Sequence, residues 1–174
     1  LGVDVKVLPG GEIFPALERG VIDAAEFVGP YQDKRLGLYK AAKYYYTTGW
    51  HEPATTSELL INKAAWETLP ADLQAVVRNA STACNLIGEA WCQRANAMAM
   101  QELVNDLGVI AQPLPTSIVE AMRTETMKVL DAAAAGDPMT KKVQDSYFAF
   151  KKQYDAWAAY SEAVYHNTVR QSKA

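Results

Sequence analysis

The sequence predicts a helix-rich α/β fold, and three observations support this class. Residues 3–7 alternate valine with polar side chains, which is the period of a β-strand. A short helical stretch and a second strand-like run follow within the first thirty residues, as in a parallel strand–helix–strand unit. Two later stretches, residues 71–106 and 138–168, carry apolar side chains at helical spacing over much greater lengths.

The composition is that of an ordinary globular protein. The 174 residues include 17 Lys and Arg against 20 Asp and Glu, which is a formal net charge of -3, and 49% are hydrophobic. These values exclude a disordered or low-complexity chain, and the lack of a basic block predicts that nucleic acid is not a partner. The chain opens without Met or a basic leader segment, so we expect it to be an internal part of a longer polypeptide.

The first thirty residues predict two strands around one short helix. Residues 3–7 form the first strand, and residues 12–19 place apolar side chains on one helical face. Gly20 stands where a glycine commonly ends a helix. Residues 21–28 are mostly apolar and stop at a Gly-Pro pair, which predicts a second strand parallel to the first.

Three further strands and a long helix are expected in the middle of the chain. Residues 43–48 are rich in tyrosine and threonine, which favour strands. Residues 58–62 form a short apolar run whose last residue, Asn62, can cap a helical turn. The long helix then covers residues 71–106, and residues 109–114 form the last strand.

The last predicted helix is long for the size of the chain. About 30 residues make a helix of roughly 45 Å, whereas a compact globule of this length is about 35 Å across. Its stripe repeats every seven residues and consists of Val143, Tyr147, Phe150, Tyr154, Trp157, Ser161, Val164 and Thr168. We therefore divide the chain into an α/β part, residues 1–114, and a helical region, residues 115–174. The last helix could curve over the surface of its own chain, but we expect it to strap two lobes or a partner chain.

Two acidic residues stand out by their position. Glu26 lies near the end of the apolar run 21–28, and Glu52 follows the tyrosine-rich strand. Ligands bind beyond the carboxyl ends of strands in open parallel sheets, so these two acids could converge on one crevice. Each could instead pair with a basic side chain, or the two could act as the acid pair of a glycosidase. The chain has no nucleophile elbow, phosphate loop or dinucleotide fingerprint.

One motif near the N-terminus is specific to a protein family. Residues 8–26, LPGGEIFPALERGVIDAAE, resemble the solute receptors of tripartite ATP-independent periplasmic (TRAP) transporters. The runs VGPY at 28–31 and GWHEP at 49–53 are similar to the subgroup that captures 2-oxoacids such as pyruvate. The resemblance implies the C-terminal portion of a two-lobed periplasmic-binding-protein-like fold with a very long C-terminal helix. It also implies a periplasmic receptor without catalytic activity, which passes a small carboxylate solute to the TRAP membrane permease.

The resemblance further implies a cation site. A sodium or calcium ion bridges the solute carboxylate to the protein in this subgroup, and no organic cofactor is involved. The implied protein ligands are Glu26, the backbone carbonyl of Phe27 and Glu52, which are the oxygen donors that hard cations prefer. The subgroup usually has tryptophan where this chain has Phe27. Its substrate-clamping arginine would fall before the first residue, and neither Arg19 nor Arg35 matches it, so we expect about half a binding site.

Other functions stay open on the residues alone. A helical interaction module would use the aromatic stripe between Tyr147 and Trp157 and would need no small ligand. A carboxylate-pair hydrolase would instead use Glu26 and Glu52 in catalysis. Some members of the resembled family form dimers by exchanging the C-terminal helix, so a homodimer is a further expectation.

Overall fold

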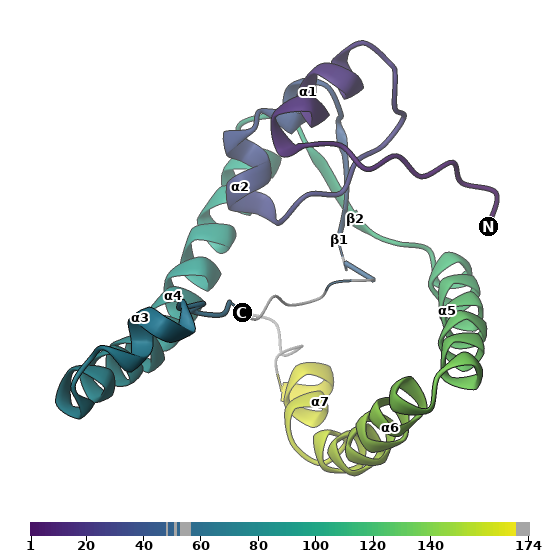
Figure 1. Cartoon of the computed structure of the whole chain (residues 1–174). Coiled ribbons are helices and arrows are strands. Elements are labelled where there is room, and N and C mark those ends of the chain that lie inside the picture. Colours follow the sequence, from purple (N-terminus) through teal and green to yellow (C-terminus); the bar gives the residue numbers. More distant parts are fainter. Residues whose placement is uncertain (48, 51, 53–56, 170–174) are drawn as a thin grey trace. The chain divides into compact units, whose positions relative to one another are not determined.

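The computed structural model describes residues 1–47, 49, 50, 52 and 57–169. The chain folds as two compact units, Leu1–Pro115 and Thr116–Ala174. Figure 1 labels the helices and strands of both units. None of the helices in the described part of the chain combines the length and the apolar character needed to cross a membrane.

The first unit contains a parallel pair of strands and several helices. Its elements are α1 (Gly10–Glu18), α2 (Pro30–Arg35), the 3-10 turn η1 (Leu38–Lys40), β1 (Tyr44–Thr47), α3 (Lys63–Glu67), α4 (Ala71–Asn105) and β2 (Ile110–Pro113). Tyr44 of β1 lies opposite Ile110 of β2, and Thr47 lies opposite Pro113. Parallel strands need a long crossover between them, and α3 and α4 belong to that crossover (Figure 1).

Two predicted helix ends are confirmed by the hydrogen bonds of the backbone. Gly20 has φ 67°, and beyond it the N–H of Val21 donates to the carbonyl of Ala16 at 2.9 Å, as in a Schellman motif. Glycine suits this position because it adopts positive φ without strain. At the start of α3, the side chain of Asn62 accepts a hydrogen bond from the N–H of Ala65 at 3.1 Å.

Helix α2 lies along the C-terminal half of α4 (Figure 1). The backbone N–H of Tyr31 donates to Oδ1 of Asn96 at 3.0 Å, and the Tyr31 ring meets Trp91 edge-on with 5.0 Å between the ring centres. Lys34 of α2 and Glu102 of α4 form an ion pair. These contacts hold a helix that, with six residues, is too short to be stable by itself.

The buried apolar core of the described chain is small and belongs to the first unit. It consists of Ile13, Ala16, Ala99, Leu103 and Val109. These residues come from α1, the C-terminal end of α4 and the approach to β2. The core therefore joins α1, the C-terminal end of α4 and the start of β2.

Three of the predicted strands are wrong. Residues 3–7, 21–28 and 58–62 pair with no strand among the described residues. A strand is stable only when a neighbour takes up its backbone N–H and C=O groups. The alternation in residues 3–7 is real, but Val3 and Val7 are 75% and 95% exposed. The predicted parallel pairing is instead made by β1 and β2, which lie at two other predicted strands, residues 43–48 and 109–114.

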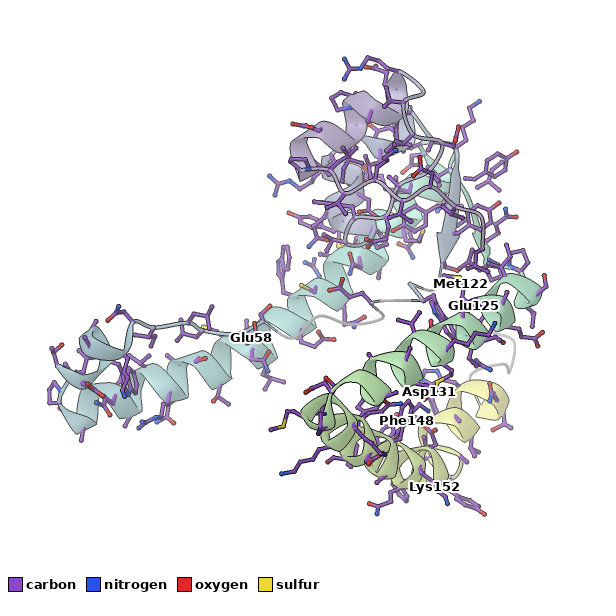
Figure 2. The ribbon with its side chains drawn as sticks, turned by 45° about the vertical axis from the view of Figure 1, so that its right-hand side comes forward. Glu58, Met122, Glu125, Asp131, Phe148 and Lys152 are labelled. Carbon is purple, nitrogen blue, oxygen red and sulfur yellow. The ribbon has the colours of Figure 1, made fainter. Side chains whose placement is uncertain are left out.

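The second unit begins with two helices of equal length joined by one residue. Its elements are α5 (Thr116–Gly136), α6 (Pro138–Ala158), α7 (Glu162–Val164) and the π-helical turn η2 (Tyr165–Val169). Asp137 caps α6 by accepting a hydrogen bond from the N–H of Thr140 at 2.7 Å. Between the helices, Nε2 of Gln144 donates to Oδ1 of Asp131 at 3.1 Å. Asp131 and Phe148 lie where α5 and α6 face each other (Figure 2).

The predicted continuous helix over residues 138–168 is divided in the structure. Helix α6 ends at Ala158, and Ser161 has φ -121° and ψ -101°, which no helix accommodates. The Ser161 hydroxyl donates to the carbonyl of Trp157 at 3.2 Å, a local bond of the kind that competes with helical hydrogen bonding. The apolar stripe on α6 stays exposed within the unit, with Phe150 and Trp157 each at 65%.

Candidate functional site

Glu26 lies in the loop between α1 and α2 and not at the end of a strand. This corrects the expected placement, because the run before it forms no strand in the structure. The Glu26 side chain is exposed, whereas the Phe27 side chain next to it is half-buried. The loop therefore presents one acidic side chain outward and anchors the following residue.

The Phe27 ring packs against the first residue of α1. A Cβ atom placed on Gly10 would lie 3.1 Å from Cε2 of Phe27, closer than van der Waals contact normally allows. The missing side chain at Gly10 thus leaves the space that the ring occupies. Because the ring contacts α1, one side of the loop is held by apolar packing.

Asp33 holds the same loop from the other side. Its Oδ1 accepts hydrogen bonds from the backbone N–H groups of Val28 and Gly29, each at 3.2 Å. Its Oδ2 accepts a hydrogen bond from the hydroxyl of Tyr45 at 2.6 Å. Asp33 is only 9% exposed, and these three donors replace the water that a buried carboxylate loses. One side chain of α2 therefore joins the loop to strand β1.

Tyr45 is a stable proton donor in this arrangement. Burial raises the pKa of its hydroxyl well above the ordinary value of 10.0, and the hydrogen bond to Asp33 raises the pKa further. The negative charges of Asp33 and Glu26 act in the same direction. The effect of Glu26 on the pKa means that its carboxylate lies within electrostatic reach of the Tyr45 hydroxyl.

Glu52 lies five residues beyond the end of β1 and has an exposed side chain. The chain turns tightly before it, since a Cβ atom placed on Gly49 would lie 3.1 Å from the backbone oxygen of Glu52. Trp50, between these two residues, is half-buried. His51 and Pro53 of the same motif lie outside the described residues.

Both predicted acidic residues are thus tied to one strand, although by different means. Glu26 is connected to β1 through Asp33 and Tyr45, and Glu52 is connected to it through the chain itself. Two carboxylates and a backbone carbonyl are hard oxygen donors that suit a calcium-like cation. Within the described residues, no three side chains of His, Cys, Asp or Glu gather to hold a metal ion. A cation at these residues therefore needs the carbonyl oxygen and other donors besides the two acids.

Asp33 and Tyr45 are site residues that the sequence analysis missed. Asp33 lies in the first turn of a helix that opens with Gly29 and Pro30, where an acidic side chain often bonds backbone N–H groups. That signal was available in the sequence. The partnership with Tyr45, twelve residues away, was not, because three successive tyrosines in β1 offer the same chemistry.

The comparison with protein families gives one match over most of the chain. The family described as bacterial extracellular solute-binding protein, family 7 (DctP), matches residues 1–137. A monocarboxylate 2-oxoacid-binding periplasmic protein of Nostoc sp. (strain PCC 7120) is 40% identical over 173 residues. The match covers 99% of this chain and 47% of that relative.

Solved structures of similar proteins agree with the fold. A TRAP periplasmic solute-binding protein from Colwellia psychrerythraea, with bound calcium and pyruvate, is 36% identical, with a TM-score of 0.89 over 95% of this chain and 51% of that one. A second, from Pseudoalteromonas atlantica with sodium and pyruvate, is 33% identical, with a TM-score of 0.84 over 94% of this chain and 50% of that one.

A third, from Bordetella bronchiseptica, is a mixed-occupancy dimer with copurified calcium and picolinate. It is 29% identical, with a TM-score of 0.84 over 94% of this chain and 48% of that one. The chain spans about half the length of the relatives that it matches. The α/β fold, predicted as a portion of a two-lobed receptor, is confirmed by these structures. The chain belongs to the DctP family of bacterial extracellular solute-binding proteins, the solute receptors of TRAP transporters.

Proposed function

We propose that this chain forms part of a periplasmic receptor that captures a small monocarboxylate, a 2-oxoacid such as pyruvate, through a bridging cation. Glu26, the carbonyl of Phe27 and Glu52 are the protein's ligands to a calcium or sodium ion, and the ion binds the solute carboxylate. The positive ion removes the repulsion between an anionic solute and two acidic side chains. The whole receptor, of the length of the relatives, supplies the remaining contacts.

The observation that carries this proposal is the common support of the two acidic segments. The Glu26 loop is fastened to β1 by Asp33 and Tyr45, and Glu52 follows the same strand. The relatives add the chemistry, because calcium or sodium accompanies pyruvate in two similar solved proteins and calcium accompanies picolinate in a third.

The proposal is tested by titrating pyruvate calorimetrically into the whole receptor, with calcium, with sodium and after chelation of divalent ions. We expect Glu26→Gln and Glu52→Gln each to weaken pyruvate binding by more than about tenfold, because each removes a charged cation ligand. The matched control is Glu18→Gln, an exposed glutamate on α1, which should leave binding unchanged.

Two results would contradict the proposal. The first is pyruvate binding that keeps its strength in both glutamine variants while the proteins stay folded. The second is pyruvate binding that does not respond to calcium or sodium. Pyruvate recovered unchanged after incubation would support a receptor, and its conversion would favour the carboxylate-pair enzyme instead.

We propose further that the bound solute is delivered to a TRAP membrane permease. The receptor would then raise uptake of pyruvate into vesicles that contain the permease, and the Glu52→Gln receptor would not. Uptake of the same size with and without receptor would remove this part of the proposal. The periplasmic location follows from the same role and from the naming of the Nostoc relative.

We propose that residues 1–114 contribute the second α/β lobe and that residues 115–174 strap the lobes or a second copy of the chain. The exposed aromatic stripe of α6 supports a partner surface, since Tyr147, Phe150 and Trp157 are each at least 60% exposed. The dimeric Bordetella relative favours a second copy. Light scattering should give twice the mass of one receptor chain, and a monomeric mass would leave strapping within one chain.

A further inference from the structure

Asp33 is the charged residue that the described part of the chain buries. Burying a carboxylate is costly unless hydrogen bonds replace its hydration. Asp33 has three such bonds, two from backbone N–H groups and one from the Tyr45 hydroxyl. An apolar residue would fill the same place without this cost. The burial of a carboxylate at this position, bonded to these three donors, therefore needs an explanation.

One of the donors belongs to the peptide unit of the proposed cation ligand. The N–H of Val28 and the carbonyl of Phe27 are parts of a single planar, trans peptide group. In such a group the N–H and the C=O point in opposite directions. Because the Val28 N–H points at the buried Asp33 carboxylate at 3.2 Å, the Phe27 carbonyl oxygen is turned away from it.

The second carboxylate oxygen of Asp33 fixes the loop relative to the rest of the site. Oδ2 accepts the Tyr45 hydroxyl at 2.6 Å, a short charge-assisted hydrogen bond. Tyr45 lies in the middle of the parallel pair, opposite Ala111 of β2. Asp33 therefore connects the peptide after Phe27 to the strand that leads to Glu52.

We propose that Asp33 is a positioning residue of the cation site, which turns the Phe27 carbonyl oxygen toward the ion and holds that carbonyl in register with Glu52. The inference rests on the proposed function and adds a residue that does not touch the ion. Residues of this kind, in the second layer around a metal, tune the metal affinity through the ligands that they orient. Capping of α2 alone would explain the bonds to Val28 and Gly29 but not the bond to Tyr45.

The experiment compares Asp33→Ala, Asp33→Asn and Asn96→Ala in the whole receptor. Pyruvate affinity is titrated at saturating calcium and after chelation, and the melting temperature of each variant is recorded without calcium. Asn96→Ala is the matched control. It removes the acceptor of the Tyr31 N–H, and Tyr31 lies on α2 as Asp33 does, but it does not touch the peptide after Phe27. It should lower the melting temperature and change the calcium-dependent affinity less than about twofold.

Asp33→Ala should lose about tenfold or more of the calcium-dependent affinity. Asp33→Asn keeps an oxygen acceptor for Val28 but loses the charge, so its loss should be smaller, about threefold. If Asp33→Ala does not fold, the asparagine variant decides the question by itself. Wild-type affinity in a folded Asp33 variant, or an equal loss in Asn96→Ala, would overturn the inference.

Failure of the proposed function gives a different result. In that case pyruvate binding by the wild-type receptor itself depends on neither calcium nor sodium, and both ideas are overturned together. Calcium-dependent binding in the wild type that both Asp33 variants retain overturns only the role of Asp33. A direct structural readout supports the affinities: in crystals of Asp33→Asn with calcium and pyruvate, the distance from the Phe27 carbonyl oxygen to the ion should lengthen.

Discussion

The two acidic segments of the first unit are both tied to β1, but by different means. The Glu26 segment lies in a loop whose shape depends on side chains from elsewhere, with Phe27 packed on α1 and Asp33 bonded to the two residues that follow. The Glu52 segment follows β1 along the chain, and its tight turn leaves no room for a side chain on Gly49. The contacts that position the Glu26 loop come from α1, α2 and β1, whereas Glu52 is joined to β1 by the chain itself.

The Glu26 side and the Glu52 side of the proposed site should therefore differ in which substitutions disturb them. Substitutions several residues away, in α1, α2 or β1, should disturb the Glu26 side of the site. Changes within or next to the turn should disturb the Glu52 side. Single substitutions can separate the two cases.

The core mutation Leu103→Ala should affect both segments. Leu103 is 2% exposed in α4, the helix that supports α2, and its carbonyl accepts the N–H of Val109 before β2. Loss of a buried leucine side chain costs about 2–5 kcal/mol of unfolding free energy. Chemical denaturation of the chain measures this. The control Leu86→Ala, 74% exposed on the same helix, should cost less than about 0.5 kcal/mol, and equal losses would show that the core is misplaced.

The substitution Gly20→Ala should destabilise the Glu26 side of the proposed site and leave the Glu52 side unchanged. Gly20 has φ 67° at the end of α1, and an alanine there costs about 1–2 kcal/mol because its Cβ atom disfavours the left-handed region. Thermal unfolding of Gly20→Ala should show this loss. Gly11→Ala, in the same helix with open space around it, should be neutral or stabilising. A destabilised Gly11→Ala beside an unchanged Gly20→Ala would refute the assigned helix end.

A change at Gly49 should instead disturb the Glu52 side. The new Cβ atom would lie 3.1 Å from the Glu52 backbone oxygen, so the turn must shift. We expect calcium-dependent pyruvate binding by the whole receptor to weaken by about threefold, as when one polar interaction is partly lost. The Tyr45 hydroxyl and the Phe27 loop should keep their contacts. Gly88→Ala, with open space on α4, serves as control, and an equal loss there would contradict the assignment.

The smallest expected effect is a dependence of stability on pH. It comes from the Tyr45 hydroxyl and not from the adjacent tyrosines of β1. The pKa of the Tyr45 hydroxyl is raised in the folded chain, so the stability that it contributes is fully present below the unfolded value, about pH 10, and is lost as the pH rises above it. The Tyr45→Phe chain should melt at a lower temperature than the wild type at about pH 8, and the difference should shrink at about pH 11. A difference of equal size at both pH values would show that the hydroxyl is not held by Asp33.

The sequence predicted the parts of the fold that depend on local chemistry. The caps at Gly20 and Asn62 and the long helix α4 follow from the glycine, the side-chain acceptor and the apolar spacing. The strand at residues 3–7 was wrong, because alternation indicates a face but not whether a partner strand is present. The single C-terminal helix was wrong because the stripe continues through Ser161, where the backbone leaves the helix.

The site was predicted less completely than the fold. Position along the chain singled out Glu26 and Glu52, and the motif resemblance added Phe27 and the cation, whose binding by these residues stays a prediction. Asp33 was not selected, because its importance comes from a peptide five residues earlier and a strand twelve residues later. Such contacts depend on the tertiary fold, which a pattern in one segment does not specify.

The central claim is that Glu26, the Phe27 carbonyl and Glu52 hold one cation that binds the solute. A crystal structure of the whole receptor grown with calcium and pyruvate tests it most directly, with the ion identified by its anomalous scattering. We predict oxygen atoms of all three residues at about 2.3–2.6 Å from the ion, with a pyruvate carboxylate completing its coordination. An ion bound without Glu26 or without Glu52, or pyruvate bound with no ion beside it, would contradict the account.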